Sequence, residues 1–138
     1  MASSPHSDTT TAGIRVQAAA QFLPQDSDPE DKKFLFTYRI TLTNLGERTA
    51  QLVSRHWVIV DADGKREVVR GPGVVGAFPR LAKGESYTYR SYCPLPTTWG
   101  TMEGSYTFQT EGGTFEVAIG RFFLVPTAPP LPAEPQRS

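Results

Sequence analysis

The chain has one cysteine, two histidines and no long apolar run, and each of these shortages excludes a class of protein. Because Cys93 has no second cysteine to pair with, no internal disulfide forms, and nothing points to an oxidising compartment. The serine- and threonine-rich N-terminal residues lack the apolar core of a signal peptide. No segment is long and apolar enough to span a membrane. The sequence therefore predicts a cytoplasmic protein with no membrane partner.

An excess of charge and a catalytic motif are also missing. The 138 residues carry 14 basic and 14 acidic side chains, whereas a nucleic-acid-binding domain usually has a strongly basic face. Of the two histidines, His6 lies near the N-terminus, so His56 has no second nitrogen ligand beside it for a zinc or cobalt site. Cys93 has no histidine near it in the sequence, and no serine has a G-x-S-x-G setting. We expect no nucleic-acid partner, no metal, no cofactor and no enzymatic activity.

The clearest pattern in the sequence is the alternation of apolar and polar side chains. In residues 34–42, five apolar side chains fall on one face, namely those of Phe34, Phe36, Tyr38, Ile40 and Leu42. This period of two is that of a strand with one buried side. Similar segments recur between turn residues, and a helical period is absent. The sequence predicts an all-β, two-sheet antiparallel sandwich of about seven strands, of the immunoglobulin or fibronectin type III kind.

Three local features refine this prediction. Asp63-Gly64 favours a hairpin because both residues tolerate a positive φ. Alternation slips between Ile119 and Phe122, which predicts a β-bulge at Gly120-Arg121. Residues 50–61 are apolar on both faces, so this strand is either covered twice or presented to a partner. A homodimer is one such partner that we expect.

Composition divides the chain into three parts. Residues 1–12 are small and polar, and we expect a disordered N-terminal tail. Residues 13–125 form the sandwich domain. Residues 126–138 hold five prolines, and we expect a second disordered tail.

Gly71, Gly73 and Gly76 match the G-x-G-x-x-G motif of dinucleotide-binding loops. That motif works by opening a helix toward a pyrophosphate, and Pro79 and Gly84 exclude a helix here. Two interpretations remain. The glycines are either required by the backbone of a strand crossing between sheets, or their N–H groups form an anion nest. A nest would bind phosphate, pyrophosphate or a nucleotide together with nearby arginines, which are Arg66, Arg70 and Arg80.

Trp99 is a large aromatic residue in a loop, since it follows Pro96 and precedes Gly100. One interpretation is that it plugs the end of the sandwich. The other is that it is exposed and anchors a protein partner, because exposed aromatic residues dominate many interfaces.

Six longer stretches resemble the ApaG family: residues 44–46, 55–61, 71–76 (GPGVVG), 81–85, 100–106 and 115–124. The resemblance implies a fibronectin type III-like sandwich. It links bacterial members to cobalt resistance, to magnesium efflux and, through gene neighbourhood, to diadenosine tetraphosphate hydrolysis. The domain also occurs in eukaryotic F-box proteins and in a protein that interacts with a DNA polymerase, which implies a protein-binding module. The family supplies no catalytic residue to carry over, but its glycine motif has been proposed as a nucleotide site.

Two hypotheses follow. The first is a non-catalytic interaction module that acts on or with a protein partner and affects divalent-cation homeostasis indirectly. The second is a small-ligand binder that recognises phosphate, pyrophosphate or a nucleotide at the glycine segment 71–76.

Overall fold

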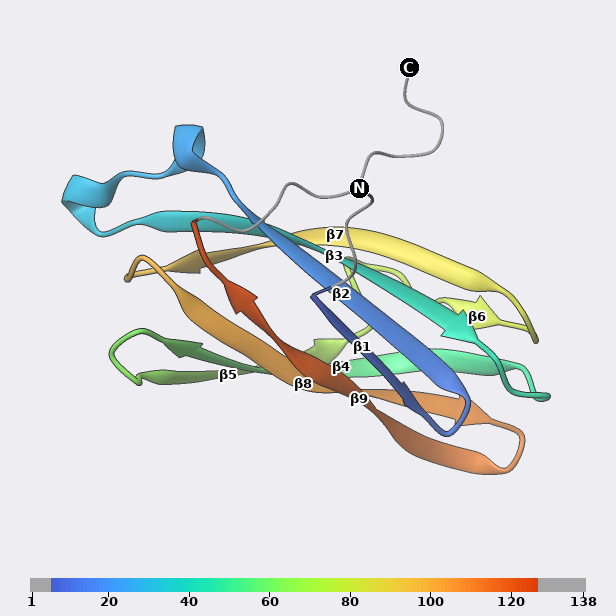
Figure 1. Ribbon diagram of the computed structural model, residues 1–138. Coiled ribbons are helices and arrows are strands. Elements are labelled where there is room, and N and C mark those ends of the chain that lie inside the picture. The colour runs from blue at the N-terminus through green and yellow to red at the C-terminus, as the bar shows by residue number, and fades with distance from the viewer. Residues whose placement is uncertain (1–5, 127–138) are drawn as a thin grey trace, which may run out of the picture.

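The structure is a computed structural model that describes residues 6–126 (Figure 1). It contains nine strands and two single-turn 3-10 helices. In chain order these are β1 (Ser7–Thr11), β2 (Ile14–Phe22), η1 (Pro24–Asp26), η2 (Pro29–Asp31), β3 (Phe34–Asn44), β4 (Ala50–Asp61), β5 (Arg66–Pro72), β6 (Arg80–Leu81), β7 (Ser86–Leu95), β8 (Gly100–Thr110) and β9 (Gly113–Leu124). Among residues 6–126, no helix is long and apolar enough to cross a membrane.

The strands form two antiparallel sheets that pack face to face (Figure 1). One has the order β1-β2-β3-β7, and the other has the order β5-β4-β8-β9 with β6 paired to the start of β4. The predicted two-sheet antiparallel sandwich is confirmed. It has nine strands instead of about seven because β1 and β6 are short additions at the margins of the sheets.

The core lies between the sheets and centres on Trp57. The predicted inward face of residues 34–42 is buried, and Trp57 meets the rings of Tyr38, Tyr106 and Phe122 in edge-on contacts. Each such aromatic pair adds about 0.5–1.5 kcal/mol to the gain from burial. The Tyr106 hydroxyl hydrogen-bonds the Tyr89 hydroxyl across the core. Burial raises the pKa of both groups, so the hydroxyls stay protonated and the pair bridges the two sheets.

Two β-bulges set which side chains face the core. Met102 pairs with Phe122 and Gly104 pairs with Ile119, so the predicted bulge at Gly120-Arg121 is confirmed. A second bulge lies in β4, where the pairing with β8 shifts between Leu52 and Ser54. It returns Leu52 and Trp57 to the same inward face and thereby turns Arg55 inward as well.

The prediction of disorder in residues 1–12 is wrong for Ser7–Thr11, which form β1 against β2. β1 lies along β9 and covers one side of the sandwich. Its small polar side chains suit this position at the margin of a sheet. Its Thr11 hydroxyl accepts a 3.3 Å hydrogen bond from the N–H of Ala118, and Asp8 pairs with Arg15 at 2.7 Å. Residues 1–5, and the tail predicted for 126–138 from residue 127 onward, lie outside the described residues.

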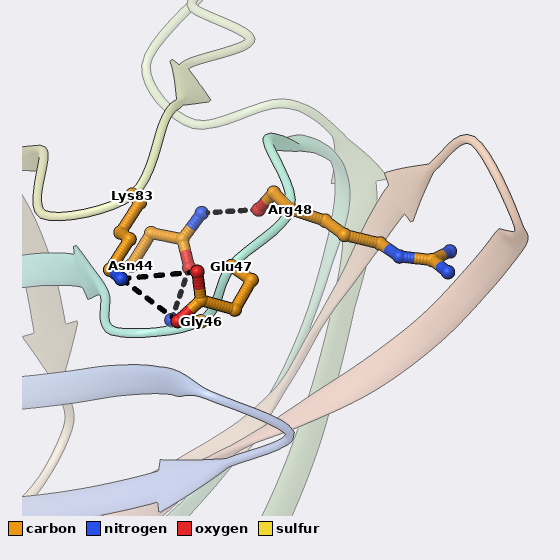
Figure 2. A network of polar contacts seen from close by, with 5 residues as sticks. All are labelled: Asn44, Gly46, Glu47, Arg48 and Lys83. Carbon is orange, nitrogen blue, oxygen red and sulfur yellow. Dashed lines mark hydrogen bonds and ion pairs between the residues drawn. The ribbon is translucent and has the colours of Figure 1, made fainter.

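Asn44 fixes the corner where β3, the turn before β4 and β6 meet (Figure 2). Its buried amide nitrogen donates to the carbonyls of Arg48 and Leu81 at 2.8 and 2.9 Å, and its oxygen accepts from the N–H of Gly46 at 2.8 Å. Beside it, Lys83 pairs with Glu47 at 2.8 Å. Because one side chain satisfies three backbone groups, this corner holds the connection between the sheets in one geometry.

Candidate functional site

The glycine turn (residues 73–77) and the Trp99 loop (residues 95–100) lie toward opposite ends of β4. The N–H of Gly73 donates to the carbonyl of Val53 near the start of β4, at 3.0 Å. Gly100 pairs with Asp61, the last residue of β4. Eight residues separate Val53 from Asp61, or about 26 Å at the rise of a strand. The two candidate sites are therefore separate surfaces.

The glycine turn is a tight hairpin held by its own backbone. Val74 and Ala77 exchange two N–H···O bonds of 2.9 Å, and the two residues between them, Val75 and Gly76, have φ of 46° and 78°. Two positive φ values at the central residues are typical of a type I′ turn. The N–H groups of Gly73, Val74 and Ala77 are thus used inside the protein.

Close contacts leave no free space for a Cβ at two of the glycines, from the backbone at Gly73 and from the Arg55 side chain at Gly71. Gly73 has φ of +59°, and a Cβ there would lie 2.5 Å from the carbonyl oxygen of Ala77. Gly71 lies against the guanidinium of Arg55, where a Cβ would be 2.8 Å from Nη2. Arg55 Nη1 in turn donates to the carbonyls of Pro72 and Gly73 at 2.8 and 2.9 Å. Sequence reasoning missed Arg55, because its inward orientation follows from a bulge that the residue pattern does not reveal.

The structure does not bring the three predicted arginines together. Arg66, Arg70 and Arg80 are exposed, and they pair with Val60, His56 and Gln51 of β4 respectively. This spacing distributes them along nearly the whole strand, over about 30 Å. Arg70 lies three residues before the glycine turn and Arg80 three residues after it, whereas Arg66 lies toward the other end of β4.

Trp99 does not plug the sandwich: its side chain is 41% exposed and stacks on Phe123, which is 51% exposed. Their ring centroids are 6.5 Å apart, with an interplanar angle of 25°. We call these two residues the aromatic pair. Sequence reasoning did not single out Phe123, although two adjacent aromatic residues in a strand, Phe122 and Phe123, signal that one of them faces outward.

The loop that carries Trp99 is fixed by hydrogen bonds. The Thr97 hydroxyl donates to the Trp99 carbonyl at 2.8 Å and accepts from the N–H of Ala62 at 3.0 Å. Ala62 belongs to the predicted hairpin, in which the Asp61 carboxylate accepts from the N–H groups of Asp63 and Lys65 at 2.9 Å each. The Trp99 loop and the hairpin therefore form one rigid unit.

Two hollows flank the neighbouring ridge of residues 94–96. One, of about 440 Å³, has apolar lining from Phe34, Leu35, Pro94, Leu95 and Pro96, with Asp26, Lys32 and Lys33 also lining it. The other, of about 520 Å³, is lined by Ile59, Asp61, Lys65, Arg66, Glu67, Val68, Pro94, Leu95 and Pro96. This end of the sandwich thus combines exposed aromatic rings, apolar hollows and nearby cations.

The described residues offer little to a metal or a nucleophilic reaction. Within 6–126, no three His, Cys, Asp or Glu side chains gather into a group that could hold a metal ion. Cys93 is buried, and burial, with a smaller contribution from Glu67, raises the pKa of its thiol to about 12. At neutral pH this thiol is protonated and shielded from solvent, so it is not a ready nucleophile.

Comparison with known proteins places the chain in a family. The family model described as the ApaG domain matches residues 24–110. The chain belongs to the ApaG family. The protein named ApaG of Dechloromonas aromatica is 50% identical over 119 residues, covering 86% of this chain and 94% of that one. The ApaG of Bdellovibrio bacteriovorus is 45% identical over 118 residues, with 85% and 93% covered.

A solved structure agrees with this assignment. The crystal structure of the Bordetella pertussis protein named ApaA has a TM-score of 0.79 and 42% identity, and the match covers 85% of this chain and 94% of that chain. The stretches that resemble ApaG include the Asn44 corner, the glycine turn and the start of β8. These names identify a family and leave its activity open.

Proposed function

We propose that this ApaG-family chain is a non-catalytic module that binds a partner protein through the Trp99 end of the sandwich. The observation that carries the proposal is the exposed aromatic pair on a loop fixed by Thr97. Large aromatic side chains supply much of the binding energy at interfaces. A loop that is already ordered loses little conformational entropy on binding, which makes it a favourable anchor.

The surroundings of the aromatic pair favour a partner with apolar side chains and acidic groups. Both hollows beside residues 94–96 accept apolar side chains, and the one lined by Lys32 and Lys33 has a single acid, Asp26, against these two cations, so it attracts a carboxylate. The influence on divalent-cation homeostasis that the family resemblance implies would then be indirect and would pass through this partner. The proposal requires no metal site in the chain itself.

Photocrosslinking tests the proposal. A photoreactive phenylalanine analogue is placed at position 99 or 123 of the full chain, in cells of the source organism. Leu45 and Val75, which are 54% and 65% exposed and lie near the start of β4, at the opposite end, are the control positions. We expect one discrete adduct with a second protein from positions 99 and 123, and no such adduct from 45 and 75. An adduct from position 75 alone would contradict the proposal.

A second proposal is that a phosphate-bearing ligand binds at the glycine turn. It is favoured by the exposed tip of the turn, Val75 and Gly76, together with the neighbouring cation of Arg70. Amide NMR spectra recorded during addition of pyrophosphate, ATP or diadenosine tetraphosphate test it. The proposal expects saturable shifts at residues 70–76 that disappear in Arg70→Ala. Unchanged spectra with all three anions would reject it.

A homodimer remains the third proposal, and it involves the outer face of the sheet that contains β4. Val58 is buried on this face beside Val60 and the exposed Val68. Sedimentation equilibrium measures the mass directly. A dimer predicts twice the 15.2 kDa chain mass at high concentration, and a monomer throughout would exclude self-association.

A further inference from the structure

The two sides of the sandwich, where the outermost strands of the two sheets meet, differ in how well they are covered. On one side β1 lies along β9, and the Thr11 hydroxyl accepts the N–H of Ala118. On the other side the outermost strands are β5 and β7, which make no comparable contact with each other. Within residues 6–126, no strand pairs with the outer edge of β5 (Figure 1). This edge is therefore open to a further strand.

The hydrogen bonds at the two ends of β5 show which of its backbone groups point outward. The N–H of Asp61 donates to the carbonyl of Lys65, and the N–H of Gly73 donates to the carbonyl of Val53, at 3.0 Å each. Because bonded pairs alternate along an antiparallel ladder, the odd-numbered residues of β5 bond to β4. The backbone groups of the even-numbered residues point away from β4, and these residues are Arg66, Val68, Arg70 and Pro72.

The arginines of β5 favour acidic groups on a strand beside it. The carbonyl of Pro72 is bonded to Arg55 at 2.8 Å, so the open stretch of the edge ends at Arg70. Arg66 and Arg70 are exposed, and neither forms an ion pair within residues 6–126. A strand added to this edge would place side chains directly opposite both arginines, where opposite charges are stabilising.

The hollow of about 520 Å³ receives the other face of such a strand. Ile59 and Glu67, which pair with each other, line this hollow together with Leu95, so it lies on the inward side of β5. Side chains alternate between the two faces of a strand, so those that do not face the arginines face the hollow. Apolar side chains there would pack against Ile59 and Leu95. The edge therefore fits an extended segment with two acids on one face and apolar side chains on the other.

A second copy of β5 does not suit this edge. In the antiparallel register centred on Val68, Arg66 of one copy would lie opposite Arg70 of the other, and like charges directly opposite are destabilising. The register centred on Val69 would set Arg66 opposite Pro72, which has no N–H to donate. The sequence of β5 thus disfavours pairing with itself and leaves the edge to a different strand.

We propose that the partner protein adds an extended segment to the edge of β5 as a further strand of this sheet. The segment carries acidic side chains opposite Arg66 and Arg70. This inference rests on the proposed function, because it names the element that the partner contributes. Arg66 and Phe123 are the ends of one row across the sheet, with Val60 and Thr101 between them. The edge thus lies about 14 Å from the aromatic pair, and one partner can cover both.

Amide NMR spectra recorded with a synthetic peptide test the edge directly. The peptide acetyl-TEVTVET-amide has the required pattern and reads the same in both directions, so it suits a parallel or an antiparallel strand. Added to the full chain at millimolar concentration, it should shift the amide signals of Arg66, Val68 and Arg70 saturably and slow their exchange with solvent. The amides of Glu67 and Val69, which already bond to β4, should change less. The lysine peptide acetyl-TKVTVKT-amide should bind about tenfold more weakly.

Variants of the full chain keep this test specific. Val68→Pro removes one outward N–H but no hydrogen bond to β4, and it should weaken peptide binding about tenfold relative to Val68→Ala, which keeps that N–H. The double variant Arg66→Glu, Arg70→Glu should reverse the preference between the two peptides. Unchanged β5 signals in the presence of the acidic peptide would overturn the proposal, as would a charge-reversed variant that still prefers it.

The crosslinked partner separates this inference from the proposed function. A partner captured from position 99 that binds Val68→Pro and Val68→Ala equally well would overturn the inference about β5 and leave the proposed function standing. Peptide binding at β5 in a chain that captures no partner from position 99 would support the edge as a binding site and reject the proposed function.

Discussion

The glycine turn and the Trp99 loop differ in what they offer to another molecule. The turn matches a phosphate-binding motif letter for letter, yet the N–H groups of Gly73, Val74 and Ala77 bond within the protein. The Trp99 loop matches no motif, yet it presents two stacked and exposed aromatic rings. The glycine motif would indicate anion binding only if its N–H donors were free. The exposed apolar surface of the Trp99 loop is therefore the stronger indication of a binding site.

The difference has a physical origin in the closing of the sandwich. Residues 73–79 carry the chain from β5 toward β6 and β7, and Val74 is fully buried there. Closing the side of the sandwich requires close backbone approach, which only glycine permits. The Trp99 loop also contains a close backbone approach, because a Cβ at Gly100 would lie 2.6 Å from the carbonyl oxygen of Val60, but it leaves the Trp99 side chain outside the core.

The largest loss of stability is expected for a substitution in the glycine turn, and it tests the structural role of that turn. Gly73→Ala places a Cβ 2.5 Å from a backbone oxygen at a positive φ, and we expect a loss of about 2–4 kcal/mol in the free energy of unfolding. Gly76→Ala is the matched control. Its φ is +78° and no atom lies within 4 Å of the added Cβ, so we expect about 1 kcal/mol. Urea unfolding followed by fluorescence measures both, and equal losses would contradict this account of Gly73.

Arg55 comes second. Arg55→Met retains the aliphatic stem but leaves the carbonyls of Pro72 and Gly73 without their donor. Hydrogen bonds to charged groups contribute about 1.5–3 kcal/mol, and we expect a loss of that size in urea unfolding. Amide exchange should rise in the glycine turn and stay unchanged at residues 97–101. Exchange that rises equally in both regions would mean that the two ends are not separate units.

Substitutions in the Trp99 loop should have the opposite pattern of effects from those at the glycine turn. We expect a small loss of stability and a large loss of partner binding. Trp99→Ala removes a half-exposed stacking contact, so we expect a loss of about 1 kcal/mol in stability. Thr97→Val keeps the side-chain shape but removes both hydrogen bonds of its hydroxyl. We expect about 1 kcal/mol again, with weaker capture of the crosslinked partner. Unchanged capture in both variants would remove this loop from the interface.

The smallest effect concerns pH and lies at β1. The Nδ1 of His6 accepts the N–H of Ala20 at 3.1 Å, and burial lowers the pKa of His6 below 6.5. As pH falls through about 6.5, the His6 imidazole therefore takes up a proton more readily in the unfolded chain than in the folded one. The free energy of unfolding consequently decreases below that pH. We expect faster amide exchange in β1 at pH 5.5 than at pH 7.5, with no change in the glycine turn. His6→Gln should remove this pH dependence, and its persistence would assign it to another group.

Local patterns were sufficient for much of the fold. The inward face of residues 34–42, the Asp63-Gly64 hairpin and the bulge at Gly120-Arg121 are all readable from a few neighbouring residues. They depend on alternation and on tolerance of positive φ, which are properties of the local sequence.

Features that depend on pairing between distant strands were not predictable. Ser7–Thr11 form a hairpin with the neighbouring β2 through the turn Ala12-Gly13, but the contact that holds them against the sandwich comes from the distant β9. The predicted arginine cluster does not form, because antiparallel register spreads Arg66, Arg70 and Arg80 along β4. The bulge near Val53, which turns Arg55 inward, likewise follows from the pairing of β4 with β8.

The most direct test of the contrast between the two surfaces is the affinity of the crosslinked partner for two variants, measured by titration calorimetry. Trp99→Ala removes an interface anchor, and we predict at least a roughly 30-fold loss of affinity, which corresponds to about 2 kcal/mol. Gly76→Ala alters the glycine turn at similar cost in stability, and we predict an unchanged affinity. A loss of affinity in Gly76→Ala with none in Trp99→Ala would contradict the account and assign binding to the glycine turn.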